Sequence, residues 1–172
     1  MVTQHYTLEN ESETRLFAQK TAQVIQELFS LNSGLVVYLQ GDLGAGKSFF
    51  SRAFIQYFLP QQKVKSPTYT IVESYQASLM TIHHFDLYRL SDPEELEYLA
   101  IRDLLTEPFI ALVEWPQKGE GVLPSANILI ELKHVNGAEE NNFDARLITL
   151  SAGSRGGAEI LKAIQNLQVS DK

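Results

Sequence analysis

Residues 35–48 read LVVYLQGDLGAGKS, and this stretch decides the fold. Its first part, Leu35 to Leu39, is a continuous apolar and β-branched run, which is typical of a strand buried on both faces of a mostly parallel sheet. Glycines break the strand between Gly41 and Gly46, and apolar residues then return at helical spacing until Pro60. The order strand, glycine loop, helix is the context in which phosphate-binding loops occur.

The loop itself fits the full pattern of Gly, four residues, Gly, Lys, then Ser or Thr. Glycines let the backbone curl so that successive amides and the following helix N-terminus surround a phosphate. Lys47 would add charge at the β- and γ-phosphates, and the Ser48 hydroxyl would ligate Mg²⁺. An ordinary turn would explain Gly44 and Gly46 but not the Lys47-Ser48 pair. We therefore expect ATP or ADP to be bound by Gly41, Asp42, Leu43, Gly44, Ala45, Gly46, Lys47 and Ser48.

The remaining periodicity predicts an α/β chain around this unit. Apolar residues at helical spacing predict helices over residues 12–30 and 158–167, and a further helix starting at Pro93 with Asp92 as its cap. Strands are predicted over residues 70–75, 79–85, 109–113, 128–132 and 146–150, with a polar turn over residues 136–142 between the last two. No linker divides the sequence. We expect a single domain over residues 1–172, a three-layer P-loop NTPase-like α/β sandwich with a mixed central sheet.

The composition bounds the partners and the compartment. The 14 Lys and Arg against 21 Asp and Glu give a net charge of −7, with no basic run, so unassisted binding to a polyanion is disfavoured and tRNA would be reached only through a protein partner. Apolar runs fall far short of the ~18 residues that span a bilayer, so we expect a cytoplasmic protein without membrane contact. With no cysteine, the chain has no disulfide and no thiolate metal site.

A metal ion at the loop needs a carboxylate at the carboxyl end of a neighbouring strand. Asp86 and Glu114 both follow such strands, and either acid is also compatible with a surface cap. His83 and His84 are adjacent, so in a strand they face opposite sides and cannot chelate one ion; a structural role or a role behind the metal site is expected for both. Trp115, the only tryptophan, either lies beside the nucleotide or packs in the core.

The segment 66–70, SPTYT, carries hydroxyls on a proline-stiffened stretch downstream of the loop. A switch that senses the γ-phosphate is one interpretation. On these residues alone, a plain entry into the next strand is the simpler one.

Four motifs in order resemble the TsaE (YjeE) family, the ATPase of bacterial tRNA threonylcarbamoyladenosine biosynthesis. They are GDLGAGKS at 41–48, SPTYT at 66–70, HFDLYR at 84–89 and VEWP at 113–116, and the similarity extends over about residues 5–150. The resemblance implies an ATPase that binds the TsaD and TsaB proteins, the pair that transfers a threonylcarbamoyl group to an adenosine beside the anticodon of ANN-decoding tRNAs. ATP hydrolysis would reset that pair between turnovers.

The resemblance also implies roles for individual residues. Lys47 and the loop amides would hold the phosphates, Ser48 and Glu114 would ligate Mg²⁺, and Asp86 would occupy the Walker-B-like position. Thr68 falls in the switch-like segment. Glu11 and Thr14 resemble the family's Glu-x-x-Thr element near the nucleotide base, and in a looser match Arg146 would reach the nucleotide. Ser48 stands where threonine is frequent in the family, which preserves the hydroxyl.

Three other classes of protein share a phosphate-binding loop. A small-molecule kinase is the main alternative, but its usual arginine-rich lid has no counterpart among the widely spaced arginines after the loop. A GTPase would carry an Asn-Lys-x-Asp motif and an Asp-x-x-Gly switch, and neither occurs. A nucleotide-gated binding module without useful hydrolysis remains an open alternative at this stage.

Overall fold

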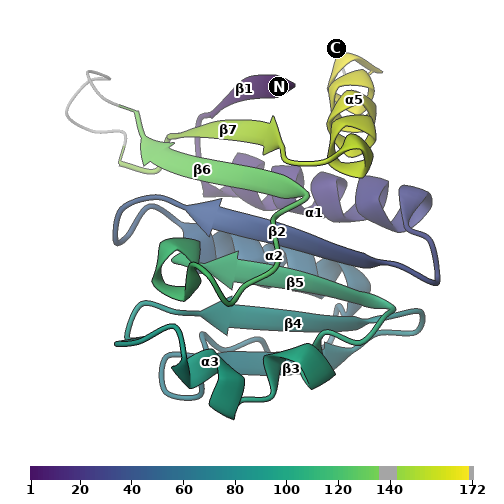
Figure 1. Ribbon diagram of the computed structural model, residues 1–172. Helices are drawn as coiled ribbons and strands as arrows, with labels where there is room; N and C mark the ends of the chain where they lie inside the picture. Colours follow the sequence, from purple (N-terminus) through teal and green to yellow (C-terminus); the bar gives the residue numbers. More distant parts are fainter. Residues whose placement is uncertain (136–142, 171–172) are drawn as a thin grey trace.

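The structure, a computed structural model, describes residues 1–135 and 143–170. Among these residues, seven strands form one sheet in the order β1-β7-β6-β2-β5-β4-β3 (Figure 1). The strands are β1 (Thr3–Leu8), β2 (Gly34–Gln40), β3 (Val72–Gln76), β4 (Thr81–Asp86), β5 (Phe109–Glu114), β6 (Ile128–His134) and β7 (Arg146–Ala152). The helices are α1 (Glu11–Leu28), α2 (Lys47–Phe58), α3 (Glu95–Tyr98), α4 (Ile101–Leu104), the 3-10 helix η1 (Pro116–Gly119) and α5 (Arg155–Ser170).

The sheet is mixed, and its parallel part sets the position of the site. Strand β2 pairs in parallel with β5 and β6, and β4 pairs in parallel with β5, whereas β1 with β7, β6 with β7, and β3 with β4 are antiparallel. In this register Glu114 lies beside Leu39 of β2 on one side and beside Asp86 of β4 on the other. The carboxyl ends of β2, β4 and β5 therefore meet at one edge, where ligands of α/β sheets bind.

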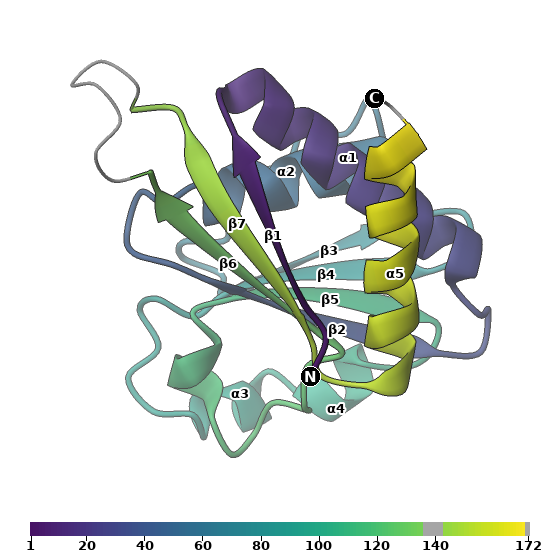
Figure 2. The ribbon, with the colours of Figure 1, turned by 90° about the horizontal axis from the view of Figure 1, so that it is seen from above.

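Helices cover both faces of the sheet, as Figure 2 shows: α1, α2 and α5 lie on one face, and α3 and α4 lie on the other. Alternate residues of β2 enter the two hydrophobic cores, because successive strand side chains point to opposite faces. Val37 and Leu39 pack in the larger core, and Val36 packs in the smaller one with Phe85 and Val113. This arrangement confirms the predicted α/β class with a mixed central sheet between two helical layers.

Helix α1 begins where its sequence provides a reciprocal cap. The Asn10 side chain accepts a hydrogen bond from the Glu13 amide at 2.9 Å, and the Glu13 carboxylate accepts one from the Glu9 amide at 2.7 Å. Two amides at the helix start are thus satisfied by side chains.

None of the helices in the described part of the chain is long and apolar enough to cross a membrane.

Several element boundaries differ from the predictions. Strand β1 was not predicted, because residues 3–8 are mostly polar and contain no apolar run. In the structure, exposed and half-buried side chains alternate along most of this strand. The strand expected over 70–75 begins at Val72, since Ile71 has a φ of 67° and its amide closes a turn onto the Pro67 carbonyl. The strand expected from residue 79, β4, likewise begins only at Thr81, because residues 77–80 form a turn in which the Ala77 amide donates to the Met80 carbonyl.

The helix expected from Pro93 is instead two short helices, α3 and α4. The Asp92 carboxylate does accept a hydrogen bond from the Glu94 amide, but residues 93–94 form a turn and α3 begins only at Glu95. Ala100, with a φ of 52°, separates α3 from α4. The predicted polar turn over residues 136–142 lies outside the described residues.

Candidate functional site

The glycine loop, residues 41–48, joins β2 to α2 with backbone angles that only glycine adopts easily. Gly41, Gly44 and Gly46 have φ values of 145°, 82° and 106°. A Cβ atom at Gly41 would also lie 2.4 Å from the Leu132 carbonyl oxygen. The loop is therefore fixed by both conformation and close approach, and it leads directly into the N-terminus of α2, whose free amides attract anions.

Lys47 is the first residue of α2 and is only 5% exposed. Its Nζ donates hydrogen bonds to the carbonyls of Gly41 at 2.6 Å and Asp42 at 2.8 Å, and it lies 4.3 Å from the centre of the Trp115 ring. Burial lowers the pKa of Lys47, and the nearby carboxylates of Glu114, Asp86 and Asp42 oppose that shift. A buried cation that faces a curled loop is suited to an anionic ligand.

Glu114 ends β5, is 2% exposed and is held by three donors. Ser48 Oγ donates to Glu114 Oε2 at 2.9 Å, Ser51 Oγ donates to Oε1 at 3.3 Å, and His84 Nε2 lies 2.8 Å from the same Oε1. A carboxylate only accepts, so His84 carries a hydrogen on Nε2, and its buried Nδ1 has no hydrogen-bond partner among the described residues. These contacts fix the orientation of the carboxylate.

Asp86 lies at the end of the neighbouring strand in a looser environment. Its carboxylate accepts a hydrogen bond from the Tyr88 amide at 3.1 Å and a long one from Ser66 Oγ at 3.4 Å. Thr68 Oγ1 in turn donates to Ser66 Oγ at 3.4 Å. Burial raises the pKa of Asp86, the Tyr88 amide partly offsets this, and the Glu114 charge adds to the increase.

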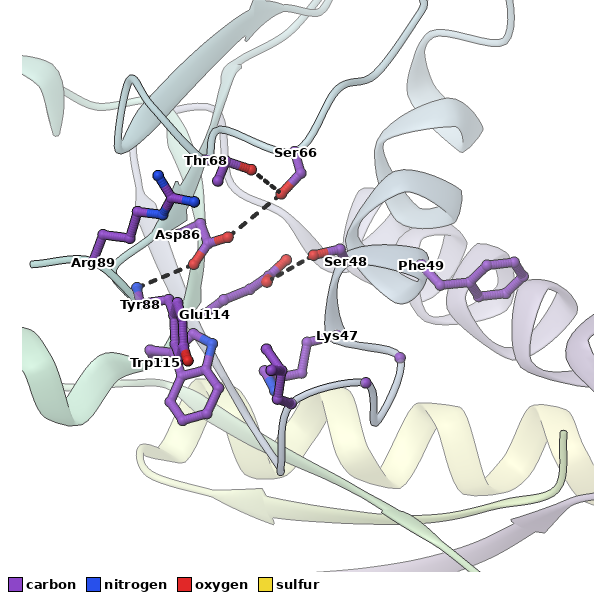
Figure 3. Close-up of a pocket in the computed structure, with 13 residues that line it drawn as sticks. Lys47, Ser48, Phe49, Ser66, Thr68, Asp86, Tyr88, Arg89, Glu114 and Trp115 are labelled. Carbon is purple, nitrogen blue, oxygen red and sulfur yellow. Dashed lines mark hydrogen bonds between the residues drawn. The ribbon is translucent and has the colours of Figure 1, made fainter. Parts of the chain in front are cut away.

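Lys47, Ser48, Asp86 and Glu114 line one cavity of about 410 Å³, and Figure 3 shows Ser48 joined to Glu114 and Lys47 beside Trp115. Of the predicted site residues, the cavity brings together Leu43, Gly44, Gly46, Lys47, Ser48, Thr68, Asp86 and Glu114. Trp115 also lines this cavity, so of its two interpretations the structure favours a position at the site. The segment that contains Thr68 is a loop and turn in front of β3.

A second, smaller cavity of about 200 Å³ adjoins the first and shares Gly44, Gly46 and Phe49 with it. Its other lining residues are Glu11, Thr14, Asp144 and Arg146. Glu11, Thr14 and Arg146, which the family resemblance assigns to the nucleotide, therefore lie together beside the glycine loop.

Three predicted loop residues, Gly41, Asp42 and Ala45, line neither cavity. Their contribution is made by backbone carbonyls. The first two bind Lys47, and the Ala45 carbonyl accepts a hydrogen bond from Arg146 Nε at 2.8 Å. They shape the loop and hold its cations in place.

Sequence reasoning missed several residues of the site, and for some of them a signal was present. Ser51 follows Ser48 by three residues, which places both hydroxyls on one face of α2. His84, for which a structural role or a role behind the metal site was expected, contacts Glu114 and shares the side of β4 that carries Asp86, while His83 faces the other side and bonds Ser74. Ser66, Tyr88 and Arg89 lie in the quoted motifs, but they were given no individual role, and Phe49 and Asp144 could be recognised only from the fold.

A family model described as "Threonylcarbamoyl adenosine biosynthesis protein TsaE" matches residues 8–143. The chain belongs to the TsaE family. This TsaE chain is similar to proteins named tRNA threonylcarbamoyladenosine biosynthesis protein TsaE from three bacteria. Identity is 44% over 150 residues with Haemophilus influenzae, covering 87% of this chain and 90% of the relative. It is 36% over 166 residues with Rickettsia conorii (96% and 87%) and 33% over 143 residues with Bacillus subtilis (83% and 82%).

A solved structure supports the same fold. The crystal structure of Bacillus subtilis YdiB superposes with a TM-score of 0.74 over 97% of both chains, at 24% sequence identity. Membership of the TsaE family places the chain in tRNA threonylcarbamoyladenosine biosynthesis, and hence in tRNA processing.

Proposed function

We propose that this TsaE chain is a Mg²⁺-dependent ATPase that binds the TsaD and TsaB pair and resets it by ATP hydrolysis, with tRNA contacted only through that pair. The observation that carries the proposal is the 2.9 Å contact between Ser48 Oγ and Glu114 Oε2, in the cavity that also contains the buried Lys47. Two hard oxygen atoms beside a buried cation form the arrangement that a metal-bound polyphosphate requires.

The donor set fits Mg²⁺. The described residues contain no group of three His, Cys, Asp or Glu side chains able to hold a metal ion. Mg²⁺ usually binds one or two carboxylates and keeps its remaining positions for phosphate oxygens and water, so Ser48 and Glu114 suffice. When bound there, Mg²⁺ would neutralise charge on the β- and γ-phosphates.

The two acids are suited to different tasks. Glu114 is fully buried and oriented by three donors, which matches a metal ligand of fixed geometry. Asp86 is half-buried, has weaker contacts and a raised pKa, which suits a group that orients the attacking water and accepts its proton. Lys47 would bind the phosphate oxygens, and the pocket of Glu11, Thr14 and Arg146 would bind the nucleotide outside its phosphates.

Partner coupling is proposed from the position of the segment 66–70. Its Ser66 hydroxyl contacts Asp86 at the cavity, whereas Tyr69 in the same segment is 87% exposed. A segment with one side toward the γ-phosphate position and the other toward solvent can change a surface when the nucleotide changes. The net charge of −7 favours a protein partner over direct contact with tRNA phosphates.

A phosphate-release assay with and without the TsaD and TsaB pair tests the proposal. Slow hydrolysis by the chain alone, a Mg²⁺ requirement and acceleration by the pair are expected. Lys47→Ala should abolish turnover while circular dichroism shows an intact fold, and the single Trp115 provides a fluorescence signal for nucleotide binding. A chain that hydrolyses no ATP in any condition, or a folded Lys47→Ala protein that turns over normally, contradicts the assignment.

A further inference from the structure

Arg89 lines the larger cavity but has no role in the function described so far. Its guanidinium lies 5.1 Å from the centre of the Tyr69 ring, at the exposed rim. None of the hydrogen bonds or ion pairs found among the described residues involves this guanidinium. Arginine stays charged and presents five donors, so a guanidinium that lines a cavity without an internal acceptor is available to an external anion.

The charges around the cavity indicate which anion this is. Lys47 and Arg89 are the cations that line it, and Lys47 is already bonded to two loop carbonyls. In Figure 3, Arg89 lies with Thr68 and Asp86 on one side of the cavity, away from Lys47. A γ-phosphate near Ser48 and Glu114 would therefore have Lys47 on one side and Arg89 on the other.

The contact with Tyr69 is weak enough for Arg89 to leave it. An exposed cation–π contact is weak, and a charge-assisted hydrogen bond to a phosphate is stronger. Tyr69 belongs to the segment 66–70, whose Ser66 and Thr68 hydroxyls reach Asp86 directly or in sequence. Any ordering of that segment moves the ring on which Arg89 rests.

We propose that Arg89 is a catalytic arginine supplied by the chain itself, which moves from Tyr69 to the γ-phosphate during hydrolysis. This inference rests on the proposed ATPase function. The water oxygen forms a bond to the γ-phosphorus while the bond from that phosphorus to the bridging oxygen breaks, and the electron pair stays on ADP. One water proton remains on the phosphate product, and the other passes to the Asp86 carboxylate and then to solvent. The guanidinium stabilises the charge that the γ-phosphoryl oxygens carry at this stage.

The test compares Arg89→Ala and Arg89→Lys with a matched control, Arg102→Ala. Arg102 is exposed, lines neither cavity of the site and makes only a 3.6 Å surface contact with Glu97. Arg89→Ala should bind ADP as the unchanged chain does but hydrolyse ATP on the order of 10³-fold more slowly, the lower end of the effect of an arginine finger. It should also lose the additional affinity for ADP with aluminium fluoride, a mimic of the transferring phosphoryl group.

Two further measurements separate catalysis from a structural role. Arg89→Lys should remain impaired, because a point charge lacks the planar fork. Added guanidinium chloride should partly restore hydrolysis by Arg89→Ala, whereas sodium chloride at equal ionic strength should not. Tyr69→Ala should change the turnover number more than the Michaelis constant, as expected of a positioning residue.

The possible failures are distinguishable. If the unchanged chain hydrolyses ATP and Arg89→Ala does so equally well, the inference on Arg89 is overturned and the ATPase function stands. If Arg89→Ala is normal alone but no longer responds to the partner pair, Arg89 binds the partner and the catalytic assignment is wrong. If the unchanged chain neither hydrolyses ATP nor binds ADP with aluminium fluoride, the proposed function itself fails.

Discussion

The two sides of the larger cavity differ in how firmly they are held. On the inner side, Glu114 and Lys47 are almost fully buried and make hydrogen bonds of 2.6–2.9 Å to Ser48, His84 and the loop carbonyls. On the outer rim, the contacts from Ser66 to Asp86 and from Thr68 to Ser66 are each 3.4 Å long, and Arg89 lies against the exposed Tyr69 ring. The inner side is thus fixed by short contacts within the chain, whereas movement of the rim would break only long hydroxyl contacts and an exposed cation–π contact. A nucleotide switch needs both properties, a fixed phosphate site and a segment that responds to it.

Each side is joined to the sheet by a residue in a left-handed conformation. Trp115, with a φ of 58°, directly follows Glu114, and Ile71, with a φ of 67°, directly follows the segment 66–70. Bulky and β-branched residues rarely adopt this conformation, and such strain costs on the order of 1–3 kcal/mol. At Ile71 the strain adjoins weak contacts, so rearrangement of the segment can relieve it. At Trp115 it adjoins a buried network that holds the residue in place.

The largest effect is expected from Glu114→Gln, a substitution on the inner side of the cavity. Glu114→Gln keeps the shape of the side chain, and its carbonyl can still accept from His84 and Ser51, so the free energy of unfolding should change by only about 1 kcal/mol. The substitution, however, removes the negative charge, and the new amide group donates a hydrogen bond to Ser48 Oγ, the oxygen that we propose as a metal ligand. Hydrolysis should fall by more than ~100-fold, because losing a metal ligand costs more than losing a residue that only hydrogen-bonds to a ligand. Mg²⁺ titrations of ATP binding, with unfolding curves as the stability control, measure both quantities.

Asp86→Asn is the matched variant on the rim side. It should retain the Mg²⁺ dependence of ATP binding while slowing hydrolysis, because the amide cannot accept a proton from water. If Asp86→Asn loses the metal dependence and Glu114→Gln keeps it, the roles of the two acids are reversed.

A smaller effect is expected from Thr68→Ala, which sharpens the contrast at the rim. The long bond from Thr68 to Ser66 contributes little to the resting chain, so ATP affinity should change by no more than about twofold, equivalent to about 0.5 kcal/mol. Stimulation of hydrolysis by TsaD and TsaB should fall by a larger factor if this segment transmits the nucleotide state. Thr70→Ala is the control, because that hydroxyl bonds Glu73 at 2.9 Å and does not line the cavity. Equal loss of stimulation in both variants would argue for a general change in the loop.

The sequence allowed prediction of the parts of the fold that local pattern determines. The run in β2, the glycines and the return of helical spacing in α2 are consecutive, so the loop and its Lys47-Ser48 pair could be placed without the rest of the chain. Strand β1 could not, because its pairing partner β7 lies at the other end of the sequence and its own pattern is polar. The break between α3 and α4 could not be predicted either, because the left-handed conformation of Ala100 has no signal in its residue type.

Within the site, the predicted acids reached the expected edge because parallel strands align their carboxyl ends. The spacing of Ser51 from Ser48 and of His84 from Asp86 indicated which faces they share, but their contacts with Glu114 join separate elements and required the fold. The same holds for Arg89 and Tyr69, which come from different segments and meet only through the fold.

The smallest expected effect lies behind the site, at His83 on the opposite side of β4 from His84. His83 is buried, its Nδ1 lies 2.7 Å from Ser74 Oγ, and burial lowers its pKa, with the backbone of Leu104 partly opposing the shift. The folded chain therefore binds a proton at His83 less readily than the unfolded chain, whose histidines titrate near pH ~6.5. Stability from this group is complete above that pH and is lost as the pH falls below it, by at most about 1.4 kcal/mol per pH unit. Denaturant unfolding at pH 7.5 and pH 5.5 should show a smaller difference for His83→Gln than for the unchanged chain, whatever the absolute stability of the variant. His134→Gln, at an exposed position at the end of β6, should retain the full difference. An unchanged pH dependence in His83→Gln would mean that the acid sensitivity of the fold arises from other groups.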